Sequence, residues 1–302
     1  MSIHRLLRLL FFPAWLALSA CEQSPDDFYR PAFGDHADTQ QIVYRFGVHP
    51  LHNPQRLSEV FSPLMDYLSE QVPGVRFKLE ASRNYPAYDR KLAALEHHFS
   101  LPNPYQTTLA IKAGYRVFAK MGDDEQFRGI ILVRKDSDIA RPADLRGKAV
   151  SYPAPTALAA TMMPQYYLQT HGVDVNMDLD NRYVGSQESS IMNVFLRQTA
   201  AASTWPPPWR ALSAERPELA EQLEVKWETA PLINNALVVH PQVPAQTVRR
   251  VRQLLVELHQ HARGQRILAA MELSRFEPAS NQTYAVVDDF LHKFSEQVRP
   301  LP

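Results

Sequence analysis

The chain alternates between short apolar runs and longer stretches in which apolar residues recur at helical spacing. Residues 42–48 (IVYRFGV) have the pattern of a short strand. Asn53 and Pro54 then predict a helix start, because Asn is a favoured N-cap and Pro is tolerated in the first turn. In this helix one face is apolar, with residues three or four apart: Leu57, Val60, Phe61, Leu64 and Leu68.

The alternation continues along the chain. Further strands are expected at 75–79, 97–101, 115–119, 129–135, 149–152, 182–184, 199–203, 224–228 and 236–240. The clearest later helices are expected at 156–170, 187–197, 244–261, 264–271 and 283–294. Strands that alternate with helices predict a mainly parallel sheet covered on both faces. We expect two such α/β lobes, joined by crossovers near 129–135 and 224–240, with a ligand site in the cleft between them.

The first residues carry a targeting pattern. Arg5 and Arg8 flank an apolar run that ends at Leu18, and small residues then precede Cys21, the only cysteine. This segment resembles a bacterial lipoprotein signal, in which the cysteine is lipidated and becomes the first mature residue. A membrane-spanning helix is the alternative, but about ten apolar residues fall short of the roughly 20 that a bilayer requires. Residues 21–40 are polar and are expected to form a flexible tether.

Charge and motifs exclude several functions. The chain has 32 basic and 32 acidic residues, and removal of residues 1–20 leaves a net charge of about −2. Such a chain lacks the basic footprint of a nucleic-acid-binding protein. It also lacks a Gly-x-Ser-x-Gly elbow, a phosphate-binding loop and a free cysteine nucleophile, so no enzyme activity and no cofactor are expected. The histidines at positions 49, 52, 97 and 98 have no metal-motif spacing, and we expect no metal site.

Four stretches carry a resemblance to a known family. They are residues 46–57 (FGVHPLHNPQRL), 61–68 (FSPLMDYL), 142–148 (PADLRGK) and 185–189 (GSQES). With them, the chain from about 42 to 294 resembles the phosphonate-binding-protein-like group of type II periplasmic solute-binding proteins. The resemblance implies a two-lobe α/β fold with a hinged interlobe cleft. The expected parts are a lipoprotein signal peptide at 1–20, a tether at 21–40, lobe 1 at 41–130 plus 229–302, and lobe 2 at 131–228.

The resemblance also implies ligand-binding residues in the first lobe. Tyr85 and Tyr105 match tyrosines that the family directs toward the ligand, and His49 stands where a tyrosine is common. The alternative for the two tyrosines is a core position with a bonded hydroxyl.

In the second lobe the implied anion site is depleted. The family's hydroxyl-rich turn corresponds to residues 152–158, where Thr156 is the one hydroxyl beyond Tyr152. Gln187 replaces a family histidine after Gly185 and Ser186, and Thr204 stands where the family has an acid that grips a ligand amine. We expect polar contacts to the ligand from Thr156, Ser186, Gln187 and Thr204, and walls of the site from His49, Tyr85, Tyr105 and Trp205. The alternatives are an ordinary helix start for the turn, a helix cap for Ser186, and surface packing for Trp205.

These residues predict a lipid-anchored solute-binding protein on the periplasmic side of a bacterial membrane. Its ligand would be a small organic or phosphonate/phosphate-like molecule, handed to the membrane permease of an ABC transporter. The alternative is a sensor that docks on a membrane signalling protein and transports nothing.

Overall fold

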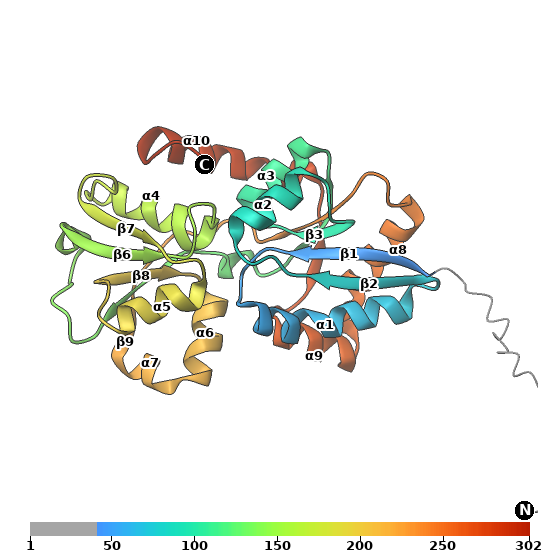
Figure 1. Cartoon of the computed structure of the whole chain (residues 1–302), viewed down its shortest axis with the longest axis horizontal. Coiled ribbons are helices and arrows are strands. Elements are labelled where there is room, and N and C mark those ends of the chain that lie inside the picture. The colour runs from blue at the N-terminus through green and yellow to red at the C-terminus, as the bar shows by residue number, and fades with distance from the viewer. Residues whose placement is uncertain (1–40) are drawn as a thin grey trace, which may run out of the picture. The chain divides into compact units, whose positions relative to one another are not determined.

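The computed structural model describes residues 41–302, which contain two β-sheets flanked by helices (Figure 1). The predicted signal peptide, Cys21 and the tether lie outside the described residues. Within 41–302, no helix is both long and apolar enough to cross a membrane.

The first sheet has six strands in the order β11-β4-β10-β3-β1-β2. We call this sheet and its helices lobe 1. Figure 1 shows α1 (Pro54–Gln71) and α9 (Ala262–Ala270) on one face, and α2 (Tyr85–Ala93) and α3 (Pro104–Ala113) on the other. The strands are β1 (Ile42–Val48), β2 (Val75–Glu80), β3 (Phe99–Leu101), β4 (Arg116–Met121), β10 (Ala236–Val239) and β11 (Phe276–Pro278); α8 (Ala245–Glu257) and α10 (Ala285–Gln297) complete the lobe.

The second sheet has five strands in the order β7-β6-β8-β5-β9, and we call it and its helices lobe 2. The strands are β5 (Ile130–Arg134), β6 (Lys148–Tyr152), β7 (Leu179–Tyr183), β8 (Ala201–Thr204) and β9 (Leu223–Glu228). The helices are the π-helix η3 (Leu158–Met162), α4 (Met163–Thr170), α5 (Gln187–Phe195), α6 (Pro206–Glu215) and α7 (Pro217–Gln222). The chain enters lobe 2 between β4 and β5 and returns between β9 and β10; the lobe boundaries at 130 and 228 stay a prediction.

The expectation of mainly parallel sheets is wrong. Strands β1, β2 and β3 pair in parallel, as do β7, β6 and β8. Strands β10, β11, β5 and β9 pair antiparallel with their neighbours. The reason is the crossovers: β5, β9 and β10 flank the two passages between the lobes, so their direction is set by where the other lobe lies and not by a local βαβ unit.

The predicted first helix is confirmed as α1. The Asn53 side chain accepts from the Arg56 amide at 2.9 Å and caps the helix. All five residues of the predicted apolar face are at most 2% exposed. Burial of each such side chain stabilises the fold by about 1.5–3 kcal/mol.

Helices α6 and α7 were not expected from the sequence. Three consecutive prolines, Pro206 to Pro208, are typical of a rigid segment outside a helix, yet they form the first turn of α6. Proline is tolerated there because the first amides of a helix have no intrahelical acceptor to lose.

Candidate functional site

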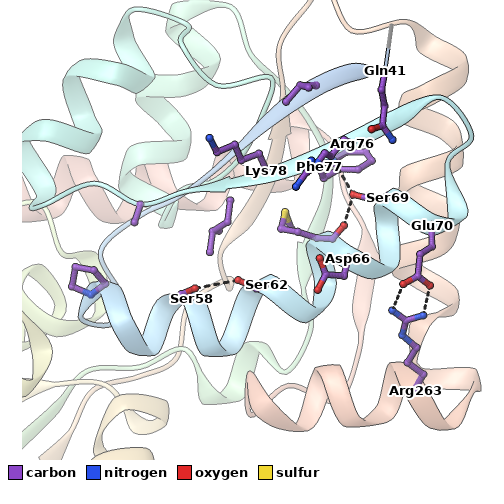
Figure 2. A pocket seen from close by; sticks show the side chains of 15 residues that line it. Gln41, Ser58, Ser62, Asp66, Ser69, Glu70, Arg76, Phe77, Lys78 and Arg263 are labelled. Carbon is purple, nitrogen blue, oxygen red and sulfur yellow. Dashed lines mark hydrogen bonds and ion pairs between the residues drawn. The ribbon is translucent and has the colours of Figure 1, made fainter. Parts of the chain in front are cut away.

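A large groove lies on lobe 1, between α1 and the edge strand β2, with a volume of about 960 Å³. Its polar side chains largely bond to one another or to the backbone. Ser69 donates to the carbonyl of Met65 and accepts from the amide of Phe77, and Figure 2 shows Glu70 paired with Arg263 of α9. A groove on one lobe alone is a poor candidate for a ligand enclosed by two lobes.

A smaller cavity lies between the lobes, where strands β1, β3, β6 and β8 end. Its volume is about 10 Å³, which is about the space that one water requires. Open α/β sheets bind ligands beyond the carboxyl ends of their strands, and we therefore take this cavity as the candidate site. It is lined by His49, Tyr85, Asn103, Phe127, Ala157, Leu158, Ala159, Ala160, Gln187, Trp205 and Asn235.

Helix N-termini surround the cavity. A lining residue begins or immediately precedes each of α2, α3, η3, α5 and α6. The N-terminus of a helix carries a partial positive charge and unpaired amides, which favour an anion. None of the lining residues within 41–302 is an acid, a lysine or an arginine. The helix N-termini thus favour an anion, although no described lining residue carries a positive charge.

The amides at the start of η3 are the clearest group of donors. The first bonds of this helix are made by the amides of Thr161 and Met162, both to the carbonyl of Ala157. The amides of residues 158–160 therefore have no intrahelical acceptor. Gly129 lets η3 lie close, because a Cβ there would be 2.5 Å from the carbonyl oxygen of Ala159.

His49 directly follows β1 and contributes an acceptor. Its Nδ1 lies 2.8 Å from the carbonyl oxygen of Leu101. Burial lowers the pKa of His49 to about 4, against the weaker opposing effect of that bond. The ring is therefore neutral at pH 7, and since a carbonyl can only accept, Nδ1 carries the proton. Nε2 is then an unprotonated acceptor.

A polar chain connects the two lobes across the cavity. Thr204 Oγ1 donates to Gln187 Oε1 at 2.7 Å, and Gln187 Nε2 donates to the hydroxyl of Tyr85 at 3.5 Å. Burial raises the pKa of Tyr85 far above its usual value, so the hydroxyl stays neutral. The Tyr85 contact is long and weak, so a ligand group can replace it at little cost.

Trp205 supplies an aromatic wall. It is 4% exposed, and its ring centroid lies 5.6 Å from that of Phe127. Both rings line the cavity. This side of the site therefore suits an apolar part of a ligand.

Four of the eight predicted ligand residues, Thr156, Ser186, Tyr105 and Thr204, do not line the cavity. Thr204 lies behind Gln187, as described above. Thr156 donates to Asp89 at 3.3 Å, Ser186 caps α5 by accepting from the amide of Ser189 at 3.0 Å, and the hydroxyl of Tyr105 donates to the carbonyl of Pro302 at 2.7 Å. Their roles toward a ligand stay predictions.

Asn103, Phe127, Asn235 and residues 157–160 line the cavity but were not predicted from the sequence. Asn103 had a detectable signal, because Asn-Pro followed by Gln106 forms the capping box at the start of α3. Asn235 and Phe127 lie in the crossovers, where no periodic pattern marks which side chains face the cleft.

Direct bonds hold the lobes closed around the cavity. Asn103 Nδ2 donates to the carbonyl of Thr156 at 2.9 Å, and the amide of Asn53 donates to Glu188 at 3.2 Å. Arg299, which follows α10, donates to the carbonyl of Pro155 at 2.9 Å. Entry of any ligand larger than a water therefore requires the lobes to separate.

The histidines considered as metal ligands do not assemble one site. His97 stacks on Tyr88, with ring centroids 5.6 Å apart, whereas His98 Nδ1 accepts from the amide of Arg45. Within residues 41–302, no three histidine, cysteine or acidic side chains are placed to hold a metal ion.

The fold is that of the type II periplasmic binding proteins, which have two α/β lobes joined by crossovers and a cavity between the lobes. The predicted fold class is therefore confirmed. The family model "ABC transporter, phosphonate, periplasmic substrate-binding protein" matches residues 46–284, and the chain belongs to this family. The resemblance expected from the sequence is thereby confirmed. The chain is a substrate-binding protein of an ABC transporter, a class that binds small ligands in the periplasm and delivers them to a membrane permease.

Solved structures share the fold at low identity. A binding protein component of an ABC phosphonate transporter from Pseudomonas aeruginosa is 19% identical, with a TM-score of 0.77 over 84% of this chain and 87% of that chain. PhnD1 from Prochlorococcus marinus, in complex with methylphosphonate, is 18% identical, with a TM-score of 0.76 over 84% and 98%. The aliphatic sulphonate-binding protein SsuA from Escherichia coli is 14% identical, with a TM-score of 0.58 over 84% and 87%. No curated protein gives a significant match.

Proposed function

We propose that the protein is a lipid-anchored solute-binding protein that binds a small organic anion of low charge in the interlobe cavity. The observation that carries the proposal is the convergence of helix N-termini on a cavity lined by neutral polar and apolar groups. Helix dipoles and amides stabilise an anion but supply no full positive charge. A headgroup with one negative charge fits such a site better than a dianion, because the cost of desolvation rises steeply with charge.

The lining of the site offers no counter-charge to a ligand ammonium group. Among the described lining residues there is no carboxylate. Asp89 lies at the lobe interface, but its two oxygens accept from Gln106 at 2.6 Å and from Thr156 at 3.3 Å. Both oxygens of Asp89 are thus already engaged by protein donors. We therefore expect aminoalkyl ligands to bind poorly.

Ligand affinity is best measured with the mature chain and four probes: methanesulfonate, methylphosphonate, phosphate and 2-aminoethylphosphonate. A ligand at 100 times its Kd adds about 2.7 kcal/mol to stability, which for a protein of this size raises the melting temperature by several degrees. We expect methanesulfonate to raise it most. Sub-micromolar affinity for phosphate or 2-aminoethylphosphonate in calorimetry would contradict the proposed ligand class.

The anchor and the membrane partner need separate tests. We expect Cys21→Ser to move the protein from the membrane fraction to the soluble periplasm. We also expect deletion of the protein to abolish uptake of the labelled ligand. Normal uptake together with loss of a ligand-induced transcriptional response would instead indicate the sensor.

A further inference from the structure

Two neighbouring asparagines precede β10 at the return crossover, and the fold uses them differently. Asn234 Nδ2 donates to the carbonyl of Gly122 at 2.7 Å, and Asn234 Oδ1 accepts from the amide of Asn235 at 2.8 Å. The side chain of Asn234 is therefore part of the crossover's own hydrogen bonding, and both its ends are satisfied.

The side chain of Asn235 is fully buried, at 0% exposure, and lines the interlobe cavity. Its Oδ1 has no hydrogen-bond partner, and its Nδ2 has only Met121 Sδ at 3.5 Å, a weak acceptor. The orientation of the amide follows from its neighbour, because Met121 Sδ can accept from the amide nitrogen but has no proton to donate to the oxygen. A buried carbonyl oxygen without a donor destabilises the protein, because it has lost its bonds to water and gained none in return.

We propose that Asn235 is a specificity-determining residue, whose amide oxygen accepts from a hydroxyl group of the bound ligand. The inference rests on the proposed function, since it assigns the second recognition element of the same cavity.

Both lobes present polar groups to the cavity. Lobe 2 presents donors, the amides of residues 158–160 at the start of η3. Lobe 1 presents acceptors, Nε2 of His49 and Oδ1 of Asn235. A ligand with an anionic end and a hydroxyl end satisfies both sets when the lobes close on it. An ammonium end would lack the carboxylate that its charge requires.

The test uses matched ligand pairs that differ by one hydroxyl: 2-hydroxyethanesulfonate against ethanesulfonate, and 2-hydroxyethylphosphonate against ethylphosphonate. We expect the wild-type protein to bind the hydroxylated member of a pair at least about tenfold more tightly, the equivalent of one well-placed hydrogen bond. We expect Asn235→Leu, which is close in size but apolar, to reduce this preference to less than about twofold.

Unfolding of the ligand-free variants supplies a readout that does not depend on any ligand. Asn235→Leu should leave the melting temperature unchanged or raise it, because it removes an unpaired buried polar group. The matched control, Asn234→Leu, should lower the melting temperature by several degrees. A large drop for Asn235→Leu would show that the fold uses this amide and would overturn the inference.

Failure of the inference and failure of the proposed function are distinguishable. Equal affinity of the wild-type protein for both members of each pair would overturn the role of Asn235 and leave the anion site intact. Absence of binding by all four sulfonates and phosphonates would overturn the proposed ligand class, and the stability of Asn235→Leu would then decide the inference alone.

Discussion

Replacement of His49 by Gln should make the protein's stability less sensitive to acid. Gln keeps a donor for the carbonyl of Leu101, which His49 Nδ1 contacts at 2.8 Å, but it does not titrate. In the folded protein burial lowers the pKa of His49 to about 4 from its ordinary value of 6.5. Between these two values the unfolded chain binds a proton at this residue and the folded protein does not. The stabilisation is therefore complete above pH 6.5 and is lost as the pH falls toward 4.

The magnitude follows from the two pKa values of His49. A pKa shift from 6.5 to about 4 corresponds to a loss of at most about 3 kcal/mol of stability, reached below pH 4. At pH 5, linkage gives a loss of about 2 kcal/mol. Burial also lowers the pKa of His52 and His97, so the wild-type protein should lose more than this in total. Both of these histidines are also present in the variant. The difference between the stability losses of the wild-type protein and the variant therefore reports the contribution of His49 alone.

The assay is urea unfolding of both proteins at pH 7 and pH 5, with the free energy of unfolding extrapolated to water. We expect the wild-type protein to lose about 2 kcal/mol more than His49→Gln between these pH values. Equal losses would refute the reasoning, since they would mean that His49 is hydrated in the ligand-free protein and that the cleft does not bury it.

Two further substitutions test the site and its closure. Trp205→Ala should lower the free energy of unfolding by about 3–5 kcal/mol, because this ring is 4% exposed and packs on Phe127. It should also weaken binding of the best probe at least tenfold, whereas the control Trp205→Phe should weaken binding less. Unchanged affinity in Trp205→Ala would make the role of Trp205 purely structural. Arg299→Ala removes the bonds to the carbonyl of Pro155 at 2.9 Å and to Gln165 at 3.1 Å. It should therefore favour lobe separation and increase the radius of gyration measured by small-angle scattering. Arg252→Ala, at an exposed site, serves as the control, and identical scattering from both variants would exclude Arg299 as a closing contact.

The elements of the fold were predictable where a local pattern determines them. The five apolar residues of α1 and its Asn-Pro start are encoded within about 16 residues of sequence, and periodicity was sufficient to find them. Strand direction at the crossovers was not predictable, because β5 and β10 take their direction from the lobe that the chain has just left. Helix α6 was missed because a run of prolines usually ends helices, and only its position in the first turn makes it permissible.

Some of the cleft-facing residues were likewise predictable from a local pattern, and others were not. His49, Tyr85, Gln187 and Trp205 stand where a strand ends or a helix begins, and those positions are visible in a sequence. The partner of Tyr105 is 197 residues away, at Pro302, and nothing local indicates that its hydroxyl is engaged there. The unpaired state of Asn235 likewise depends on how β4 and β10 meet, so it is a property of the assembled fold alone.

The turn at residues 152–158 bears on the proposed anion site through its backbone as well as through its side chains. One threonine and two prolines suggest a loss of donors, and the threonine hydroxyl indeed bonds to Asp89. The prolines, however, are Pro153 and Pro155, which precede the three amides that start η3. Those amides come from the backbone, so no substitution short of proline at 158–160 removes them. A site can therefore lose its hydroxyl side chains and keep its helix N-terminus, and the consequence is a weaker field, suited to a ligand of lower charge.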